Sequence, residues 1–285
     1  MESHITIPKS TLRRFADVET KKFTYYDFEQ KKIRVCAPKS YNKEEGYYKA
    51  EYEHWLDVNV ETPMGVLYKA IDDFEKSRGV FSGDYDNIRK QLIVFVAAQS
   101  ARMESTVEEV MDPEHRNAAI NKVLGEIIKQ GELTPSAIKR ANKYREQVSS
   151  VEKRRDTFYT PDNTQKMIRL LEKRYTDHVA NFAIIDEAVD ASFIITPMHF
   201  FQHGNRLIIP CAPRYAYILM PKSEQERDYL AEHEGELVQR WIRLKEPNMV
   251  NFLPHCIAAV KKYTPHHLIA DRAYLEKLVK EKQLD

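Results

Sequence analysis

The pattern of apolar and polar positions changes period about two thirds of the way along the chain. In the first part, apolar residues recur at spacings of three and four, which is typical of amphipathic helices. The run from residue 88 to residue 103 is apolar on most sides, as expected of a helix in the centre of a core. With its capping and breaker residues, the pattern predicts helices over 48–57, 63–79, 88–103 and 162–178, the last capped by Asp162 or Thr164.

Short β-rich runs follow, separated by turn residues such as Pro197, Gly204 and Pro213. They predict one antiparallel sheet from the runs 182–185, 192–196, 206–210 and 215–220. Near the N-terminus, the runs 22–27 and 31–36 predict a β-hairpin that Pro38 ends. Helices are predicted again over 223–244, 249–262 and from 271 onward. The predicted fold class is therefore α+β, with an N-terminal β-hairpin and a small antiparallel sheet covered by helices.

The segment 113–155 differs in composition from its surroundings. It is charged and rich in helix formers, has few large apolar residues, and is broken at Gly131 and Pro135. We interpret it as a peripheral pair of helices, a lobe inserted into a single domain that spans 1–285.

Composition and charge exclude several classes of protein. Apolar residues make up 42% of the 285 residues and charged residues 31%, enough to form a sizeable core. The formal net charge is only +1, so any attraction to nucleic acid must be local. Three widely spaced cysteines argue against a disulfide framework and a zinc knuckle. Without a leader-like segment or a long apolar stretch, the chain is predicted to be cytoplasmic and not associated with a membrane.

Sequence motifs narrow the chemistry mainly by their absence. The chain has no GxxxxGK[ST] phosphate loop, no GxGxxG turn, no GxSxG elbow and no HExxH helix. His199 and His203 lie in a loop without further ligands nearby, so we predict no metal site. The acidic group at 186–190 is interpreted as a solvated turn, and the basic stretch at 153–174, interleaved with acids, as a solvated helix face.

Polar residues in otherwise apolar or extended segments are the candidates for a site. Gln99 and Arg102 lie three residues apart on the most apolar helix and therefore share a face, and Glu61 precedes the helix that starts near Pro63. They indicate either a ligand-binding pocket or a structural clamp that fixes helix packing. His4, in the N-terminal stretch, is either a general acid or base or a solvated residue of an edge strand.

Several motifs resemble, in order, those of the bacterial domain-of-unknown-function 4238 family (DUF4238). They are His4-x-x-Ile7-Pro8-x-x-x-Leu12-Arg13-x-Phe15, Glu61, Gln99-x-x-Arg102, Phe193-Ile-Ile-Thr196, Pro210-x-x-Pro213-Arg214 and Asn251. Two positions depart from the family pattern. The family's doubled histidine is reduced to His4, and its Ser-Asp-Asn-Pro reads Thr196-Pro197-Met198-His199 here.

The resemblance covers nearly the whole chain and sharpens the functional hypothesis. It implies that distant segments converge on one pocket, with His4 and Glu61 as acid or base and with Arg13, Gln99 and Arg102 as ligand-binding residues. Such a pocket suits a phosphate-bearing ligand or nucleic acid, in a bacterial defence or mobile-element setting. The alternative is a non-enzymatic interaction module, in which these residues are a clamp and the 113–155 helices dock a protein partner. Enzymatic activity and cofactors are left open.

Overall fold

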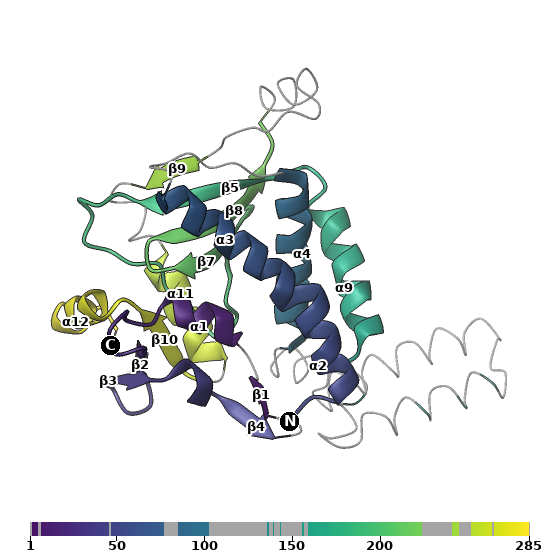
Figure 1. The fold of residues 1–285 in the computed structure, drawn as a ribbon, viewed down its shortest axis with the longest axis horizontal. Helices are drawn as coiled ribbons and strands as arrows, with labels where there is room; N and C mark the ends of the chain where they lie inside the picture. The colour runs from purple at the N-terminus through teal and green to yellow at the C-terminus, as the bar shows by residue number, and fades with distance from the viewer. Residues whose placement is uncertain are drawn as a thin grey trace, which may run out of the picture.

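In the computed structural model, the described residues form three β-sheets, one of them only two-stranded, and several packed helices (Figure 1). It describes residues 2–4, 7–45, 47–76, 85–102, 159–223, 241–244, 252–263 and 265–284, and four single positions between 136 and 156. The helices and antiparallel sheets confirm the predicted α+β class. Apart from the single positions 136, 139 and 143, the predicted helical lobe over 113–155 lies outside the described residues. Within the described residues, no helix is both long and apolar enough to span a membrane.

The larger sheet has five strands in the order β6-β7-β8-β5-β9. Their bounds are His178–Ile185 for β5, Phe201–His203 for β6, Arg206–Ala212 for β7, Tyr215–Pro221 for β8 and Trp241–Leu244 for β9. Both faces of this sheet are buried: Leu207 and Ile209 pack toward one hydrophobic cluster, whereas Ile208, between them, packs toward another. Because successive side chains of a strand point to opposite faces, a sheet covered on both sides needs uninterrupted apolar runs.

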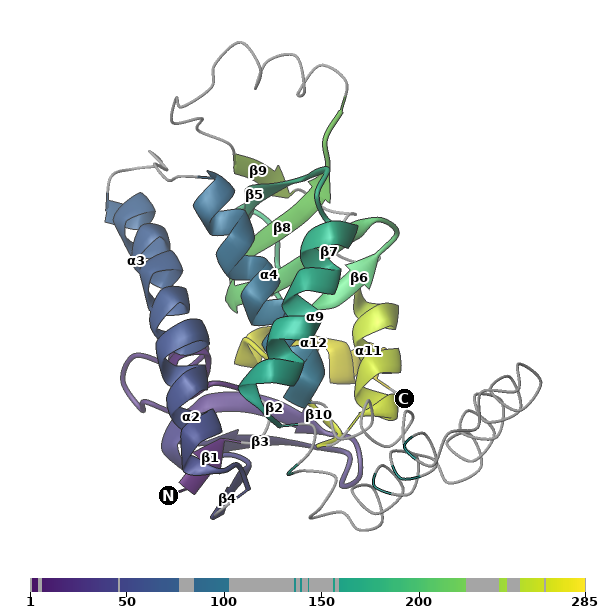
Figure 2. The ribbon, with the colours of Figure 1, turned by 90° about the vertical axis from the view of Figure 1, so that its right-hand side faces the viewer.

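Helices cover one face of this sheet (Figure 2). They are α2 (Ala50–Leu56), the π-helical turn η2 (Asp57–Glu61), α3 (Thr62–Lys76), α4 (Tyr85–Arg102) and α9 (Pro161–Arg174). Helix α4 contacts β5, α3, η2 and α9. Its Leu92, Ile93 and Phe95 are fully buried, as predicted for a helix that is apolar on most sides.

The π-helical turn η2 joins α2 and α3 without a break in the helical path. The N–H of Thr62 donates to the carbonyl of Asp57, five residues earlier. Pro63 follows directly. A proline ring collides with the carbonyl four residues before it in a regular α-helix, so a wider turn at this point relieves the clash. The turn ends at Glu61, which is thereby placed beside α4.

The second sheet packs on the face of the larger sheet that the helical layer does not cover. It has the order β10-β2-β3 and consists of Phe23–Asp27 (β2), Lys32–Cys36 (β3) and His267–Ala270 (β10). The predicted hairpin is confirmed as β2 and β3. Around this sheet lie α1 (Lys9–Arg14), the 3-10 turn η1 (Pro38–Ser40), the strands β1 (Glu2–His4) and β4 (Lys43–Glu45), and the helices α11 (Leu253–Lys262) and α12 (Arg272–Lys280).

Several predicted elements differ from the structure. The run 192–196 forms no strand, and only Ile195 bridges to Ile269 of β10. Residues 241–244, predicted as the end of a helix, form β9, which pairs in parallel with β5. Strands β6 and β10 and helix α1 were not predicted. Helix α9 is capped by Thr160 rather than by Asp162 or Thr164, and it ends at Arg174.

The cap of α9 provides a test of the fold. The Thr160 hydroxyl accepts a hydrogen bond of 3.3 Å from the backbone N–H of Asn163. We expect Thr160→Ala to lower the free energy of unfolding by about 1 kcal/mol, because that N–H loses its partner. Thr160→Ser keeps the hydroxyl and should stay close to the wild type. Urea unfolding measures both variants, and an equal loss in the two would contradict the capping role.

Candidate functional site

Helix α1 directs its two arginines to different environments. Arg13 is exposed, whereas Arg14 is half-buried and its Nη1 donates to Asp72 Oδ1 at 2.7 Å. The Arg14 guanidinium also lies 5.3 Å from the centre of the Tyr68 ring. Neighbouring residues of a helix point about 100° apart, so only one of two consecutive arginines can face the core. Arg13, one of the three predicted ligand-binding residues, therefore lies at the surface.

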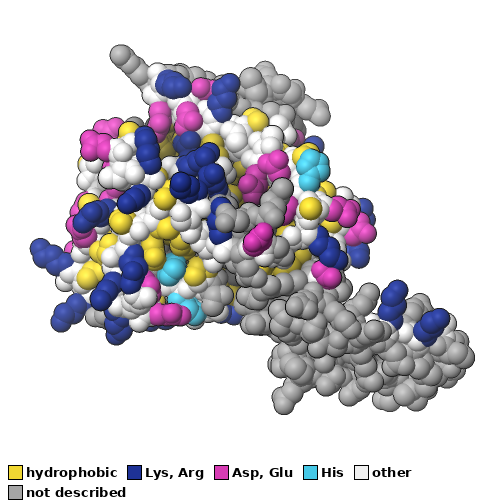
Figure 3. Space-filling model, turned by 60° about the horizontal axis from the view of Figure 1, so that its bottom comes forward, with side chains coloured by type: hydrophobic (Ala, Val, Ile, Leu, Met, Phe, Trp, Pro, Cys, Tyr) yellow, Lys and Arg dark blue, Asp and Glu magenta, His cyan; other side chains and the backbone are white. Residues whose placement is uncertain are grey.

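Arg13 lines a hollow that we call the basic hollow. Its volume is about 540 Å³, and it is bounded by Lys9, Arg13, Ala16, Asp17, Val18, Lys21, Ala37, Pro38 and Lys39. The floor is largely apolar and the charged side chains are mostly cationic. Figure 3 shows Lys and Arg side chains gathered around hydrophobic atoms on the face of the molecule that it presents. A volume of this size suits a small-molecule ligand.

The basic hollow keeps a positive charge because its cations are not neutralised. Among the described residues, Lys9, Arg13, Lys21 and Lys39 form no ion pair. The carboxylate of Asp17 accepts hydrogen bonds from the backbone N–H groups of the turn that follows, at 3.1 and 2.7 Å. Hydrogen bonds from Thr20 lower the pKa of Asp17, so its carboxylate is ionised but already engaged. One such acid does not cancel four cations.

Two other predicted site residues, Glu61 and Arg102, meet inside the protein. Arg102 Nη2 lies 3.8 Å from Glu61 Oε1, and the arginine side chain is only 2% exposed. Its guanidinium lies 5.4 Å from the centre of the Tyr48 ring, a cation–π contact that joins the end of α4 to the segment before α2. Glu61 retains 29% of its side-chain exposure. This pair is buried far more deeply than a typical surface salt bridge.

In the Glu61–Arg102 pair, burial and the charge of the partner shift the pKa of each residue in opposite directions. Burial raises the pKa of Glu61, and the nearby Arg102 charge partly offsets that rise. Burial alone would lower the pKa of Arg102, but Tyr48 and Glu61 stabilise the cation and raise it above its ordinary value. Arg102 is therefore a permanent internal charge. An internal charge needs fixed partners, since a buried ion without them is strongly destabilising.

Gln99 and His199 extend the buried polar cluster. Gln99 is 1% exposed, and its Nε2 has no hydrogen-bond partner among the described residues. His199 is fully buried, its Nε2 donates to the carbonyl of Pro210 at 3.1 Å, and its ring meets Phe95 edge-on. Burial lowers the pKa of His199 to about 3, so the ring is neutral at physiological pH. We name Glu61, Gln99, Arg102, His199 and Tyr48 the internal polar cluster.

The five predicted site residues are thus not placed together. Glu61 and Arg102 form the internal pair, and Gln99 lies one turn before Arg102 on α4. Arg13 is exposed and lines the basic hollow instead. His4 lies in β1, where its backbone pairs opposite Lys43, and its role stays a prediction.

His199 was not predicted as a member of the cluster and was considered only as a metal ligand. One feature of the sequence indicated that this histidine is buried: it is followed directly by Phe200 and Phe201, which are both buried. We also did not predict that a site would include Lys9, Lys21 and Lys39, because these lysines lie in separate segments of the sequence. The described residues contain no group of three or more His, Cys, Asp or Glu side chains placed to hold a metal ion.

In comparisons with known proteins, no protein-family model, no curated protein and no solved structure matches this chain. The resemblance to the 4238 family, with its implied bacterial origin and defence setting, stays a prediction.

Removal of Arg102 tests the internal pair. We expect Arg102→Ala to lower the free energy of unfolding by about 3 kcal/mol, because Glu61 is left partly buried without its partner. Lys90→Ala, at an exposed position of the same helix, is the matched control and should change stability by less than about 0.5 kcal/mol. Urea unfolding measures both. A loss below about 1 kcal/mol in Arg102→Ala would show that the pair does not hold α4 in place.

His199 predicts a pH dependence of stability. Its pKa is about 3 in the folded protein and about 6.5 in an unfolded chain. The unfolded state therefore takes up a proton first, so the stabilising contribution is complete above about pH 6.5 and is lost as pH falls toward 3.

The loss due to His199 should approach about 1.4 kcal/mol per pH unit within that window. Burial also lowers the pKa of His267, which adds a loss in the same direction. We therefore compare His199→Gln with His54→Gln, an exposed control, by urea unfolding at several pH values. Only His199→Gln should reduce the loss of unfolding free energy as the pH falls. If the two variants show the same dependence of stability on pH, His199 is not the group responsible.

Proposed function

We propose that the protein binds a phosphate-bearing ligand in the basic hollow, with Arg13 as the principal contact. The observation that supports this function is the set of four cations, Lys9, Arg13, Lys21 and Lys39, around one largely apolar floor. None of the four has an ion-pair partner among the described residues. Cations held close together repel one another, and an anion relieves that repulsion.

Phosphate fits the hollow better than a carboxylate for reasons of charge and shape. A guanidinium donates two parallel hydrogen bonds to a phosphate, and lysines add point charges from the sides. A group with more than one negative charge can engage several of the four cations at once. The apolar lining at Ala16 and Pro38 lowers the local dielectric, which strengthens these contacts.

The segment around the hollow is locally basic although the whole chain is nearly neutral. Between residues 9 and 39, lysines and arginines clearly outnumber aspartates and glutamates. Two of these arginines are already paired, Arg14 with Asp72 and Arg34 with Asp27. The remaining cations give the positive field that attracts a phosphate ester.

The internal polar cluster has a different role in this proposal. Arg102 is 2% exposed and contacts Glu61 and Tyr48, which favours a structural clamp. The clamp fixes the end of α4 against the π-helical turn and thereby supports the helical layer. Catalysis by Glu61 is not part of the proposal.

The test is calorimetric titration with inorganic tripolyphosphate and with ATP at low salt. We expect both to bind the wild type and Arg13→Ala to bind about tenfold more weakly or worse, since a charge-assisted contact contributes about 1.5–3 kcal/mol. Arg206→Ala, an exposed arginine at the start of β7, is the matched control and should bind like the wild type.

The salt dependence gives a second readout. Added salt should weaken binding to the wild type, and Arg13→Ala should show a shallower dependence because one fewer cation meets the ligand. Equal losses in the Arg13 and Arg206 variants would show that binding follows net charge and not the hollow. Failure of the wild type to bind either probe would overturn the proposed function.

A further inference from the structure

The face of the small sheet beside the basic hollow carries a tyrosine with an unusual setting. Tyr25 of β2 lies opposite Arg34 in β3 and opposite Ile269 in β10. Its side chain is partly exposed, and its hydroxyl has no hydrogen-bond partner among the described residues. The ring lies 4.4 Å from the His267 ring and 5.8 Å from the Tyr41 ring, centre to centre. Tyr25 is therefore packed against neighbouring rings, while part of its side chain remains accessible to solvent.

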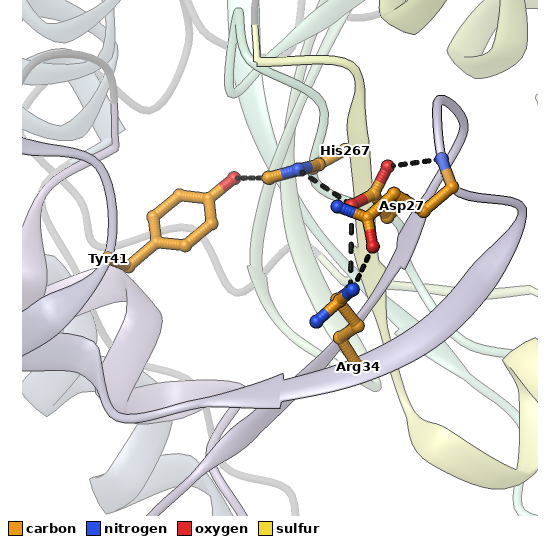
Figure 4. A network of polar contacts seen from close by, with 5 residues as sticks. Asp27, Arg34, Tyr41 and His267 are labelled. Atoms are coloured by element: carbon orange, nitrogen blue, oxygen red, sulfur yellow. Dashed lines mark hydrogen bonds and ion pairs between the residues drawn. The ribbon is translucent and has the colours of Figure 1, made fainter.

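A polar network fixes the residues around this ring (Figure 4). The Tyr41 hydroxyl and His267 Nδ1 share a hydrogen bond of 3.0 Å. His267 Nε2 lies 3.8 Å from Asp27 Oδ2, and the same carboxylate oxygen lies 3.7 Å from Arg34 Nε. Since the other oxygen of Asp27 accepts from the backbone N–H of Gln30, the carboxylate is fully engaged. The polar side chains next to Tyr25 thus contact one another, whereas the Tyr25 side chain is only partly buried.

The ring and the basic hollow are joined by one short segment of chain. Strand β3 ends at Cys36, and the next three residues, 37–39, form a wall of the hollow. Tyr41 follows two residues later and contacts both Tyr25 and His267. Ala16, which lines the hollow, also bridges to Phe23, two residues before Tyr25 in β2. The hollow and Tyr25 therefore lie near each other at the small sheet.

We infer that Tyr25 is a stacking platform for a nucleotide base whose phosphate lies in the basic hollow, and that the ligand is single-stranded nucleic acid. This inference rests on the proposed function and adds the class of ligand to it. Bases of a single strand present free faces to aromatic side chains, whereas bases of a duplex are already stacked on one another. A cationic groove that holds the backbone, next to an aromatic ring that holds a base, is the usual arrangement for such ligands.

Nothing in this arrangement reads sequence. The polar groups nearest to Tyr25 are engaged in the network of Asp27, Arg34, Tyr41 and His267, so they offer few free donors or acceptors to a base edge. We therefore expect binding that tolerates any base and weakens with salt.

The experiment compares ligands with and without bases. Fluorescence anisotropy is measured with a labelled single-stranded oligothymidine, and unlabelled competitors are an abasic strand of equal length, duplex DNA, ATP and tripolyphosphate. We expect the abasic strand to compete at least about fivefold more weakly than oligothymidine, because it lacks the stacking contribution. Tyr25→Leu should lose about fivefold or more for oligothymidine and nothing for tripolyphosphate, while Tyr25→Phe keeps the ring and should bind like the wild type.

The outcomes separate this inference from the proposed function. If Arg13→Ala weakens every probe but the abasic strand competes as well as oligothymidine, the hollow binds phosphate and the stacking platform is wrong. If Arg13→Ala weakens none, the proposed function itself fails. Melting temperatures of both Tyr25 variants control for folding. Should Tyr25→Leu unfold, the abasic comparison on the wild type still decides.

Discussion

The burial of α4 is the constraint on which the rest of the structure depends. This helix contacts β5 on one side and α3, η2 and α9 on others, and its Leu92, Ile93 and Phe95 side chains have no exposure to water. It nevertheless ends in Arg102, whose guanidinium cannot reach solvent. A buried cation must be met by a carboxylate and by polarisable groups, and Glu61 and Tyr48 fill those roles. The π-helical turn that accommodates Pro63 is what brings Glu61 to that place.

The need of a buried cation for partners also explains why the basic residues of the first forty positions divide into two sets, one partly buried and paired and the other at the surface. The interior accepts Arg14 only with Asp72 and Tyr68 beside it, and it accepts Arg102 only with Glu61 and Tyr48. Cations that lack such partners remain at the surface. In this chain, four of them line one largely apolar hollow. The clustering is thus a property of the fold, because the hollow combines residues of α1, the turn after it and η1.

The sequence predicted the elements whose signals are local. The buried strands and α4 follow from apolar runs such as Leu207–Ile209, and the hairpin follows from two β-rich runs around a short turn. The proximity of Glu61 to Arg102 was suggested by an isolated charge on an apolar helix that needed a partner. Strand β9 was not predicted because parallel pairing with β5 depends on residues some sixty positions away. Strand β10 was missed likewise, because its pairing with β2 joins the two ends of the chain.

The candidate site was harder to predict because it depends on which face of α1 is directed toward solvent. Arg13 and Arg14 are chemically equal in the sequence, and which one faces outward is decided by the packing of Leu12 and Phe15 into their small cluster. That cluster also contains Phe23, Tyr41 and Ile269, so the N-terminal helix, the hairpin and the C-terminal strand share one core. Tyr25 packs against this core and contacts His267, and Ala16 belongs both to the core's surroundings and to the lining of the hollow. A ligand bound there would contact the start of the chain on a surface that the end of the chain holds in shape, which makes the docking of β10 a condition for binding.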